Sequence, residues 1–168
     1  IAEIFFMAKE LAKTYDPKEV EDRIYRSWEE SGFFAPEAHQ PRADNPHAKP
    51  FTVIMPPPNA NGPLHIGHAV FVTLQDTMIR FQRMRGKKTL WLPGADHAGF
   101  ETQVVFDKKL DKEGRNRFAI PRDQLFKEMW DFTMANKKVM EGQLRKLGAS
   151  CDWSREKFTL DSDIVATV

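Results

Sequence analysis

The spacing of apolar residues predicts the elements of this chain. Over residues 17–31, Val20, Ile24 and Trp28 recur at every fourth position, which is typical of one face of a helix. Asp16 precedes a proline and stands three residues before a glutamate, an arrangement that caps the first turn of a helix. We therefore expect a helix over these residues.

A second run of regular spacing lies in the middle of the chain. Within residues 66–84, four apolar residues follow one another at intervals of four, four and three, which predicts a long helix with one apolar face: Val70, Leu74, Met78 and Phe81. Short apolar runs at residues 51–55 and 89–92 have the length of buried strands. The order strand, helix, strand is typical of a βαβ unit, whose two strands are parallel.

The remaining segments extend the same α/β pattern. We expect helices over residues 100–113 and 121–147 and a further short strand at residues 158–160. The loops after the strands at 51–55 and 89–92 both leave carboxyl ends of parallel strands, and such ends form the ligand crevice of an open α/β sheet. The sequence therefore predicts one shared ligand site made by two loops.

Composition restricts the class of protein without naming a function. The 168 residues are 41% hydrophobic and 29% charged, which is ordinary for a globular domain, and the net charge of +1 creates no strong field for nucleic acid or membrane. No apolar run reaches the length of about 18 residues that a membrane span needs. The single Cys151 excludes an internal disulfide and suits a reducing compartment, so we predict a cytoplasmic protein. A basic cluster at residues 80–88 would contact RNA phosphate or, as we prefer, form the solvated C-terminal end of a helix.

The first loop carries residues suited to binding an anion. Three prolines stiffen it, Gly62 loosens it, and His65 and His68 then stand at the start of the expected helix. The unpaired N–H groups and the positive dipole end of a helix attract phosphate. Gly67 lacks a side chain, so a flat base or ribose is able to lie against the backbone there.

The second loop carries a carboxylate. Asp96 follows a strand and a glycine, which is a suitable position for a carboxylate that pairs with a cationic group of a ligand or caps a turn. We assign no chemical role to the neighbouring His97. Two other interpretations stay open: His65, His68, His97 and Asp96 are residue types that bind zinc, and the histidines of the first loop are also found as cap or surface residues.

Both loops resemble a known family. His65-Ile66-Gly67-His68 is similar to the signature tetrapeptide of the class I aminoacyl-tRNA synthetases. The Met-Pro-Pro-Pro-Asn sequence that ends at Asn59 and the Gly-Ala-Asp-His-Ala-Gly sequence at residues 94–99 resemble the valyl branch of that family. Residues 24–34 and 145–156 resemble its N-terminal helix and the segment just ahead of its editing insertion.

The resemblance implies an ATP-dependent ligase. Such an enzyme activates valine as valyl-adenylate and passes it to tRNA(Val), so valine, ATP and tRNA(Val) are the expected partners, with neither DNA nor a membrane. Mg²⁺ is expected to enter with ATP, and no metal site is expected on the protein. By this resemblance His65 and His68 are the catalytic residues that contact the ATP phosphates in the transition state, and Gly67 lies under the adenine.

The same resemblance assigns the amino-acid side of the site. It implies that Asn59 and Asp96 hold the amino group of valine. Pro56 forms a wall of the side-chain pocket, and a rigid ring there suits a pocket that excludes larger side chains.

Other functions remain as alternatives. Ala60-Asn61 stands where the valyl branch usually has Val-Thr and is more similar to the isoleucyl branch, and Phe100-Glu101 replaces the usual Ile-Ala. The Gly-Ala-Asp-His-Ala-Gly sequence favours valine over isoleucine and leucine. The alternatives are isoleucyl-like activation, another His-x-Gly-His nucleotidyl transferase, which would lack the proline lead-in and the Asp96 loop, and a non-catalytic nucleotide-binding module.

Three regions are expected along the chain. Residues 1–6 have the character of a leader, because Met7 is similar to a natural start. Residues 7–50 form the N-terminal helix and a surface loop, and residues 51–168 form the first half of a Rossmann-like parallel-sheet catalytic domain, truncated at the C-terminus and ending before the editing insertion. The family's lysine-rich second signature has no match here. We therefore expect the isolated fragment to be inactive.

Overall fold

A parallel βαβ unit forms the centre of the protein in the computed structural model, which describes residues 13–40 and 47–168. Strands β1 (Phe51–Ile54) and β2 (Thr89–Leu92) pair in parallel, with Phe51 beside Thr89 and Ile54 beside Leu92. Helix α2 (Ile66–Met84) connects them and contacts both strands. The predicted βαβ crossover is thus confirmed, whereas the expected leader at residues 1–6 lies outside the described residues.

The other elements follow the expected order with small differences at their ends. The helices are α1 (Pro17–Glu30), α3 (Gly99–Lys112), α4 (Arg122–Lys146) and α5 (Ser162–Val165). Three short 3₁₀ turns lie between them: η1 (Pro36–Ala38), η2 (Arg117–Ala119) and η3 (Trp153–Arg155). The first of these turns falls in the surface loop that we expected after the N-terminal helix, within residues 7–50, of which residues 41–46 lie outside the described part.

A second pair of parallel strands, β3 and β4, follows the β1–β2 pair. Strand β3 (Gly94–Ala95) follows β2 after Pro93 and pairs in parallel with β4 (Lys157–Phe158). The expectation that Gly94 begins a loop is therefore wrong, because Gly94 and Ala95 are held in a short strand by backbone hydrogen bonds such as Thr159 N–H to Ala95 O at 3.1 Å. A Cβ on Gly94 would lie 3.2 Å from the Lys157 carbonyl oxygen, so a larger residue would push the two strands slightly apart.

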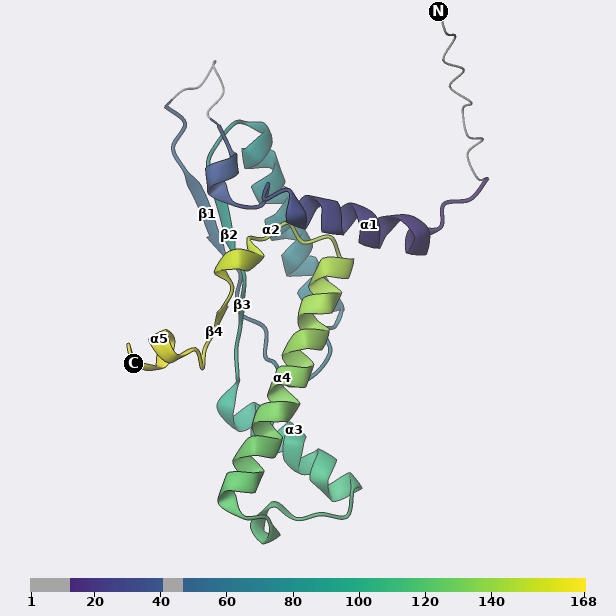
Figure 1. Ribbon diagram of the computed structural model, residues 1–168, viewed down its shortest axis with the longest axis vertical. Coiled ribbons are helices and arrows are strands. Elements are labelled where there is room, and N and C mark those ends of the chain that lie inside the picture. Colours follow the sequence, from purple (N-terminus) through teal and green to yellow (C-terminus); the bar gives the residue numbers. More distant parts are fainter. Residues whose placement is uncertain (1–12, 41–46) are drawn as a thin grey trace, which may run out of the picture.

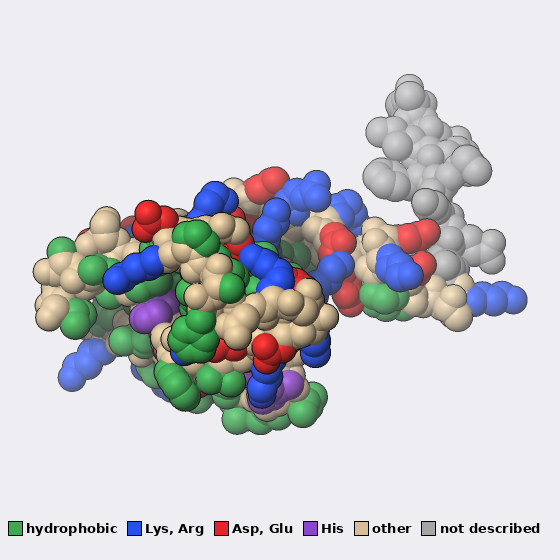
Figure 2. All heavy atoms as spheres, turned by 90° about the horizontal axis from the view of Figure 1, so that it is seen from below, with side chains coloured by type: hydrophobic (Ala, Val, Ile, Leu, Met, Phe, Trp, Pro, Cys, Tyr) green, Lys and Arg blue, Asp and Glu red, His purple; other side chains and the backbone are tan. Residues whose placement is uncertain are grey.

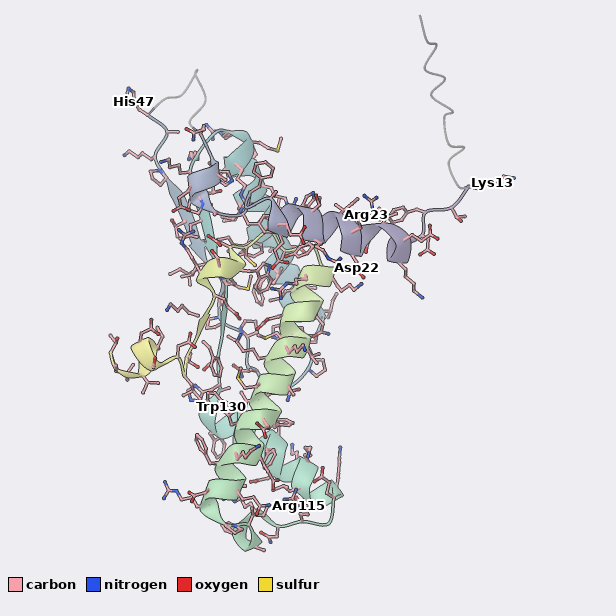
Figure 3. The ribbon with its side chains drawn as sticks, in the orientation of Figure 1. Lys13, Asp22, Arg23, His47, Arg115 and Trp130 are labelled. Atoms are coloured by element: carbon pink, nitrogen blue, oxygen red, sulfur yellow. The ribbon has the colours of Figure 1, made fainter. Side chains whose placement is uncertain are left out.

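The helices surround this strand layer unevenly. Figure 1 shows α2 beside the β1–β2 pair, while α4 extends away from the strands with α3 along its first half. Helix α1 lies across the C-terminal end of α4, where Asp22 forms an ion pair with Lys146 (Figure 3). A cavity of about 580 Å³ lies between these two helices, and none of the predicted site residues line it.

Two apolar clusters hold the layers together. The larger one joins β1, α2, β2 and the end of α4 through seven buried residues: Met55, Val72, Ile79, Trp91, Leu144, Ala149 and Cys151. The smaller one lies under the two loops and consists of Ala60, Ala95, Met140 and Phe158. Leu64 packs against both clusters, so the segment just ahead of α2 is fixed to the strand layer. Among the described residues, no helix is both long and apolar enough to cross a membrane.

The buried face of α2 is not the face that the spacing of apolar residues predicts. Val72 and Ile79 are buried on it, whereas Val70, Leu74, Met78 and Phe81 each expose between 48% and 63% of their surface. The periodic apolar pattern identified the helix correctly, but these four residues, which we call the α2 stripe, face solvent. A row of large apolar side chains on a surface is typical of an interaction site or an aggregation-prone patch.

We expect the α2 stripe to bind a hydrophobic dye in the 168-residue chain. Replacing Leu74 and Phe81 together with glutamine should lower the fluorescence of bound 1-anilinonaphthalene-8-sulfonate by about half, because two of the four exposed apolar side chains of the stripe are removed. Phe118→Gln is the matched control, since that ring is 84% exposed and lies in η2. An equal loss in the control would contradict the prediction.

Arg83 ties α2 to its neighbours from inside the basic cluster. Its guanidinium donates hydrogen bonds to the carbonyl oxygens of Phe34 at 3.2 Å and Ser150 at 2.8 Å. Burial lowers the pKa of Arg83 to about 10. Arg80 forms an ion pair with Asp76 at 2.6 Å. The interpretation of the basic cluster as a solvated helix end is therefore wrong for Arg83. On the face of the molecule drawn in Figure 2, positive and negative side chains are interspersed.

Candidate functional site

The two motif loops are joined through their backbones. Asn59 and Asp96 form an isolated parallel bridge beyond the end of the β1–β2 ladder. The N–H of Ala60 donates to the Asp96 carbonyl oxygen at 2.7 Å, and the N–H of Asp96 donates to the Pro58 carbonyl oxygen at 2.9 Å. The structure therefore brings together the two residues that the sequence predicts on the amino-acid side of the site.

The Asp96 carboxylate is held by one oxygen. Its Oδ1 accepts hydrogen bonds from the Ala98 N–H at 3.1 Å and from the Thr159 hydroxyl at 3.0 Å. The side chain is 35% exposed, and His97 Nδ1 lies 3.5 Å from the same Oδ1. Within the described ranges no residue forms a hydrogen bond or an ion pair with Oδ2. A carboxylate with one fixed and one available oxygen is suited to accept a hydrogen bond from a cation such as an ammonium group.

Two histidines cap the N-terminus of α2 in a reciprocal manner. His65 is the N-cap residue, and its Nδ1 accepts the N–H of Gly67 at 3.1 Å. The N–H of His65 in turn donates to Nδ1 of His68 at 3.2 Å. Because each Nδ1 is an acceptor, the hydrogen-bond network assigns the proton of each neutral imidazole to Nε2.

This capping leaves two N–H donors at the positive end of a helix. The imidazole centroids lie 4.1 Å apart, and neither Nε2 has a partner in the part of the chain that the structure describes. Burial lowers the pKa of His68, and the positive charge of His65 when protonated lowers it further, so both effects favour the neutral His68 ring. Two Nε2–H groups added to the dipole end of α2 are able to bind phosphate oxygens.

Gly67 makes room for the His65 ring. A Cβ at this position would lie 2.9 Å from Cε1 and 3.1 Å from Nδ1 of His65. The glycine is thus required by the conformation of the histidine, in addition to any ligand that lies against it.

We expect Gly67→Ala to displace the His65 ring and so to break the cap. Loss of an N-cap costs about 1 kcal/mol of stability, and the KM for ATP should rise about tenfold as the donor moves away. Gly62→Ala is the matched control, because no atom lies within 4 Å of a Cβ there. Thermal unfolding and ATP kinetics check both effects in the full-length gene product; an unchanged KM in Gly67→Ala would contradict the argument.

The histidine pair adjoins the bridge between the loops. Leu64 precedes His65 and packs against the cluster that contains Ala60 and Ala95, the neighbours of Asn59 and Asp96. The Leu64 N–H also donates to Oε1 of Gln143 on α4 at 2.7 Å. Both predicted halves of the site thus rest on the same small cluster.

Pro56 and His97 complete the set of predicted residues. Pro56 is exposed while the adjacent Met55 is fully buried, so its ring is accessible as the wall of a pocket. His97 is 39% exposed on its side chain, and its Nδ1 lies 2.7 Å from the Thr159 hydroxyl. The zinc interpretation gains no support, since the described residues contain no group of three or more potential metal-binding side chains.

Sequence reasoning missed two residues of the site. Thr159 and Gln143 reach the loops from elements about 60 to 80 positions away in sequence. The predicted short strand at residues 158–160 was an available signal for Thr159, because its carboxyl end lies at the same edge as the two loops. No pattern in the sequence indicates the contact of Gln143.

Comparison with known proteins gives consistent matches. Residues 23–168 match the family model of tRNA synthetases class I (I, L, M and V). The chain is 48% identical over 155 residues to the valine–tRNA ligase of Clostridium acetobutylicum and 49% identical over 159 residues to that of Caulobacter vibrioides. These alignments cover 92% and 94% of the chain but only 17% of either relative.

Two further matches add an organellar relative and a fold. The chain is 46% identical over 163 residues to the chloroplastic/mitochondrial valine–tRNA ligase 2 of Arabidopsis thaliana, covering 97% of the chain and 16% of the relative. A crystal structure of an Agrobacterium radiobacter K84 LeuRS, solved in a ternary complex with tRNA and LeuAMS, superposes with a TM-score of 0.66 at 24% identity. That match covers 90% of the chain and 17% of the LeuRS chain and shows a shared fold.

Proposed function

This chain belongs to the class I tRNA synthetases of the I, L, M and V group, and from that premise we propose that it forms the valine- and ATP-binding part of a valine–tRNA ligase. Within that enzyme it would be the first half of a Rossmann-like catalytic domain. Valine and ATP would react to valyl-adenylate and pyrophosphate, and the valyl group would pass to tRNA(Val). The similarity of 46–49% to valine–tRNA ligases supports valine over isoleucine as the substrate.

The backbone bridge between Asn59 and Asp96 carries this proposal. It holds the backbones of two polar residues from separate loops side by side, next to the segment that begins α2. A substrate held at the bridge by its ammonium group would place its carboxylate toward the end of the helix. The exposed Pro56 on the same loop would limit the size of the substrate's side chain.

The chemistry requires positioning rather than a covalent nucleophile. The carboxylate of valine attacks the α-phosphate of ATP in line, and pyrophosphate leaves. Negative charge increases on the phosphate oxygens in the transition state, where donors fixed in advance are most effective. The Nε2–H groups of His65 and His68 would supply such donors, because the reciprocal cap holds both rings.

Mg²⁺ would be held by the substrate. This ion prefers oxygen ligands and usually keeps several waters, whereas the donors at the start of α2 are N–H groups. The triphosphate of ATP would therefore provide the ligands, and the ion would neutralise part of its charge.

The cytoplasmic location expected from the sequence stays a prediction.

Exchange of labelled pyrophosphate into ATP tests the proposal. In the full-length gene product, valine should drive exchange at least about a hundredfold more efficiently than larger amino acids. Threonine has nearly the same shape as valine, and a hydrophobic pocket should favour valine over threonine by no more than about a hundredfold. Exchange driven best by isoleucine would contradict the assigned substrate. ATP binding without exchange for any amino acid would favour the non-catalytic module, and transfer to another acceptor would favour a nucleotidyl transferase.

A further inference from the structure

A single hydroxyl connects Asp96, His97 and the end of β4. Oγ1 of Thr159 lies 3.0 Å from Asp96 Oδ1, 2.7 Å from His97 Nδ1 and 2.9 Å from the backbone nitrogen of His97. Thr159 directly follows β4 and is half-buried. The contacts bring a residue from the C-terminal part of the chain onto the Asp96 loop.

The hydrogen-bonding capacity of a hydroxyl determines the direction of each contact. A threonine hydroxyl has one proton to donate and two lone pairs that accept. The backbone N–H of His97 must be a donor, and an ionised Asp96 carboxylate only accepts. The hydroxyl proton therefore goes to Asp96 Oδ1, and the remaining lone pair accepts a proton from His97 Nδ1.

We propose that Thr159 is a positioning residue for amino-acid binding: its single hydroxyl fixes both Asp96 Oδ1 and the His97 ring. This inference rests on the proposed function. Together with the Ala98 N–H, the hydroxyl holds Oδ1 and leaves Oδ2 to meet the ammonium group of valine. The same contacts place the proton of the neutral His97 ring on Nδ1, so that Nε2 is an acceptor.

The hydroxyl is not needed to hold β4 in place. The backbone N–H of Thr159 donates to the Ala95 carbonyl oxygen at 3.1 Å, and the N–H of Phe158 donates to Oδ2 of Asp161 at 2.8 Å. The Phe158 side chain is buried in the smaller apolar cluster. Valine at position 159 would keep the backbone contacts and nearly the same shape while removing all three hydroxyl contacts.

Steady-state exchange kinetics of the full-length gene product test the proposal. We expect Thr159→Val to raise the KM for valine about tenfold, with kcat and the KM for ATP within about twofold, because one hydrogen bond to a charged group is lost. Thr159→Ser keeps the hydroxyl and should restore the KM for valine to within about twofold. Thr77→Val is the matched control, since among the described residues its hydroxyl hydrogen-bonds only to the Thr73 carbonyl oxygen on the surface of α2.

A double variant tests whether Thr159 acts through Asp96. The variant Asp96→Asn/Thr159→Val should have the valine KM of Asp96→Asn alone, because the side chain that the hydroxyl holds then carries no charge to meet the ammonium group. Additive effects, an unchanged KM in Thr159→Val, or no rescue by serine would overturn the positioning role. If the unsubstituted protein shows no exchange with any amino acid, the proposed function fails and the inference fails with it.

Discussion

Asp96→Asn is expected to raise the KM for valine about 30- to 100-fold in the full-length gene product, with the KM for ATP unchanged within about twofold. Asparagine keeps an oxygen that accepts the Ala98 N–H and the Thr159 hydroxyl, so the loop stays in place. The change removes the negative charge that would meet the ammonium group. A hydrogen bond to a charged group contributes about 1.5–3 kcal/mol, and every 1.4 kcal/mol is a factor of ten.

The measurement is amino-acid-dependent pyrophosphate exchange at several valine and ATP concentrations. Asp111→Asn is the matched control, because that residue is exposed near the C-terminal end of α3, whereas the Asp96 loop leads into the N-terminal end of the same helix. If Asp96→Asn changed the KM for ATP as much as the KM for valine, Asp96 would not be specific to the amino acid.

His65→Asn is expected to lower kcat about a hundredfold while leaving the thermal stability unchanged. Asparagine is among the best N-cap residues, so its side-chain oxygen would accept the Gly67 N–H in place of the imidazole. It would not supply the Nε2–H donor. Removing one preorganised donor to the charge of a transition state costs about 10²–10³ in kcat.

Three comparisons separate catalysis from capping at this helix. His65→Ala should lose both the donor and the cap and therefore also unfold at a lower temperature. His68→Ala should lower kcat to a similar extent, because that ring presents the second Nε2–H. His47→Ala should change neither quantity, since Figure 3 places His47 at one end of the molecule, and it precedes β1. A His65→Asn variant with full kcat would remove His65 from the catalytic group.

The sequence predicted the parts of the fold that depend on local patterns. The strand–helix–strand order at residues 51–92 was sufficient to expect parallel strands and two loops at one edge, and the Asn59–Asp96 bridge shows the two loops in direct contact. The bounds expected for α2 from its apolar spacing, residues 66–84, are those of the structure, and Gly86, with a positive φ of 74°, follows its end.

The rest depends on contacts that no local pattern contains. The α2 stripe has the more regular apolar spacing, yet the buried face carries Asp76 and Arg83. Besides its ion pair with Arg80, Asp76 accepts hydrogen bonds from Ser150, and Arg83 donates to backbone carbonyl groups far away in sequence. The strand pairing of Gly94 and Ala95 depends likewise on residues 157–159. The roles assigned to the site residues stay predictions that the variants above test.

The most direct test of a single valine–ATP site is the binding of a stable analogue of valyl-adenylate, measured by calorimetry in the full-length gene product. The account predicts that 5′-O-(N-valylsulfamoyl)adenosine binds at least about a hundredfold more tightly than valine or ATP alone, because it resembles the reacting pair. Asp96→Asn and His65→Asn should each weaken it at least about tenfold. An analogue affinity that either variant leaves unchanged would contradict a site shared by the two loops.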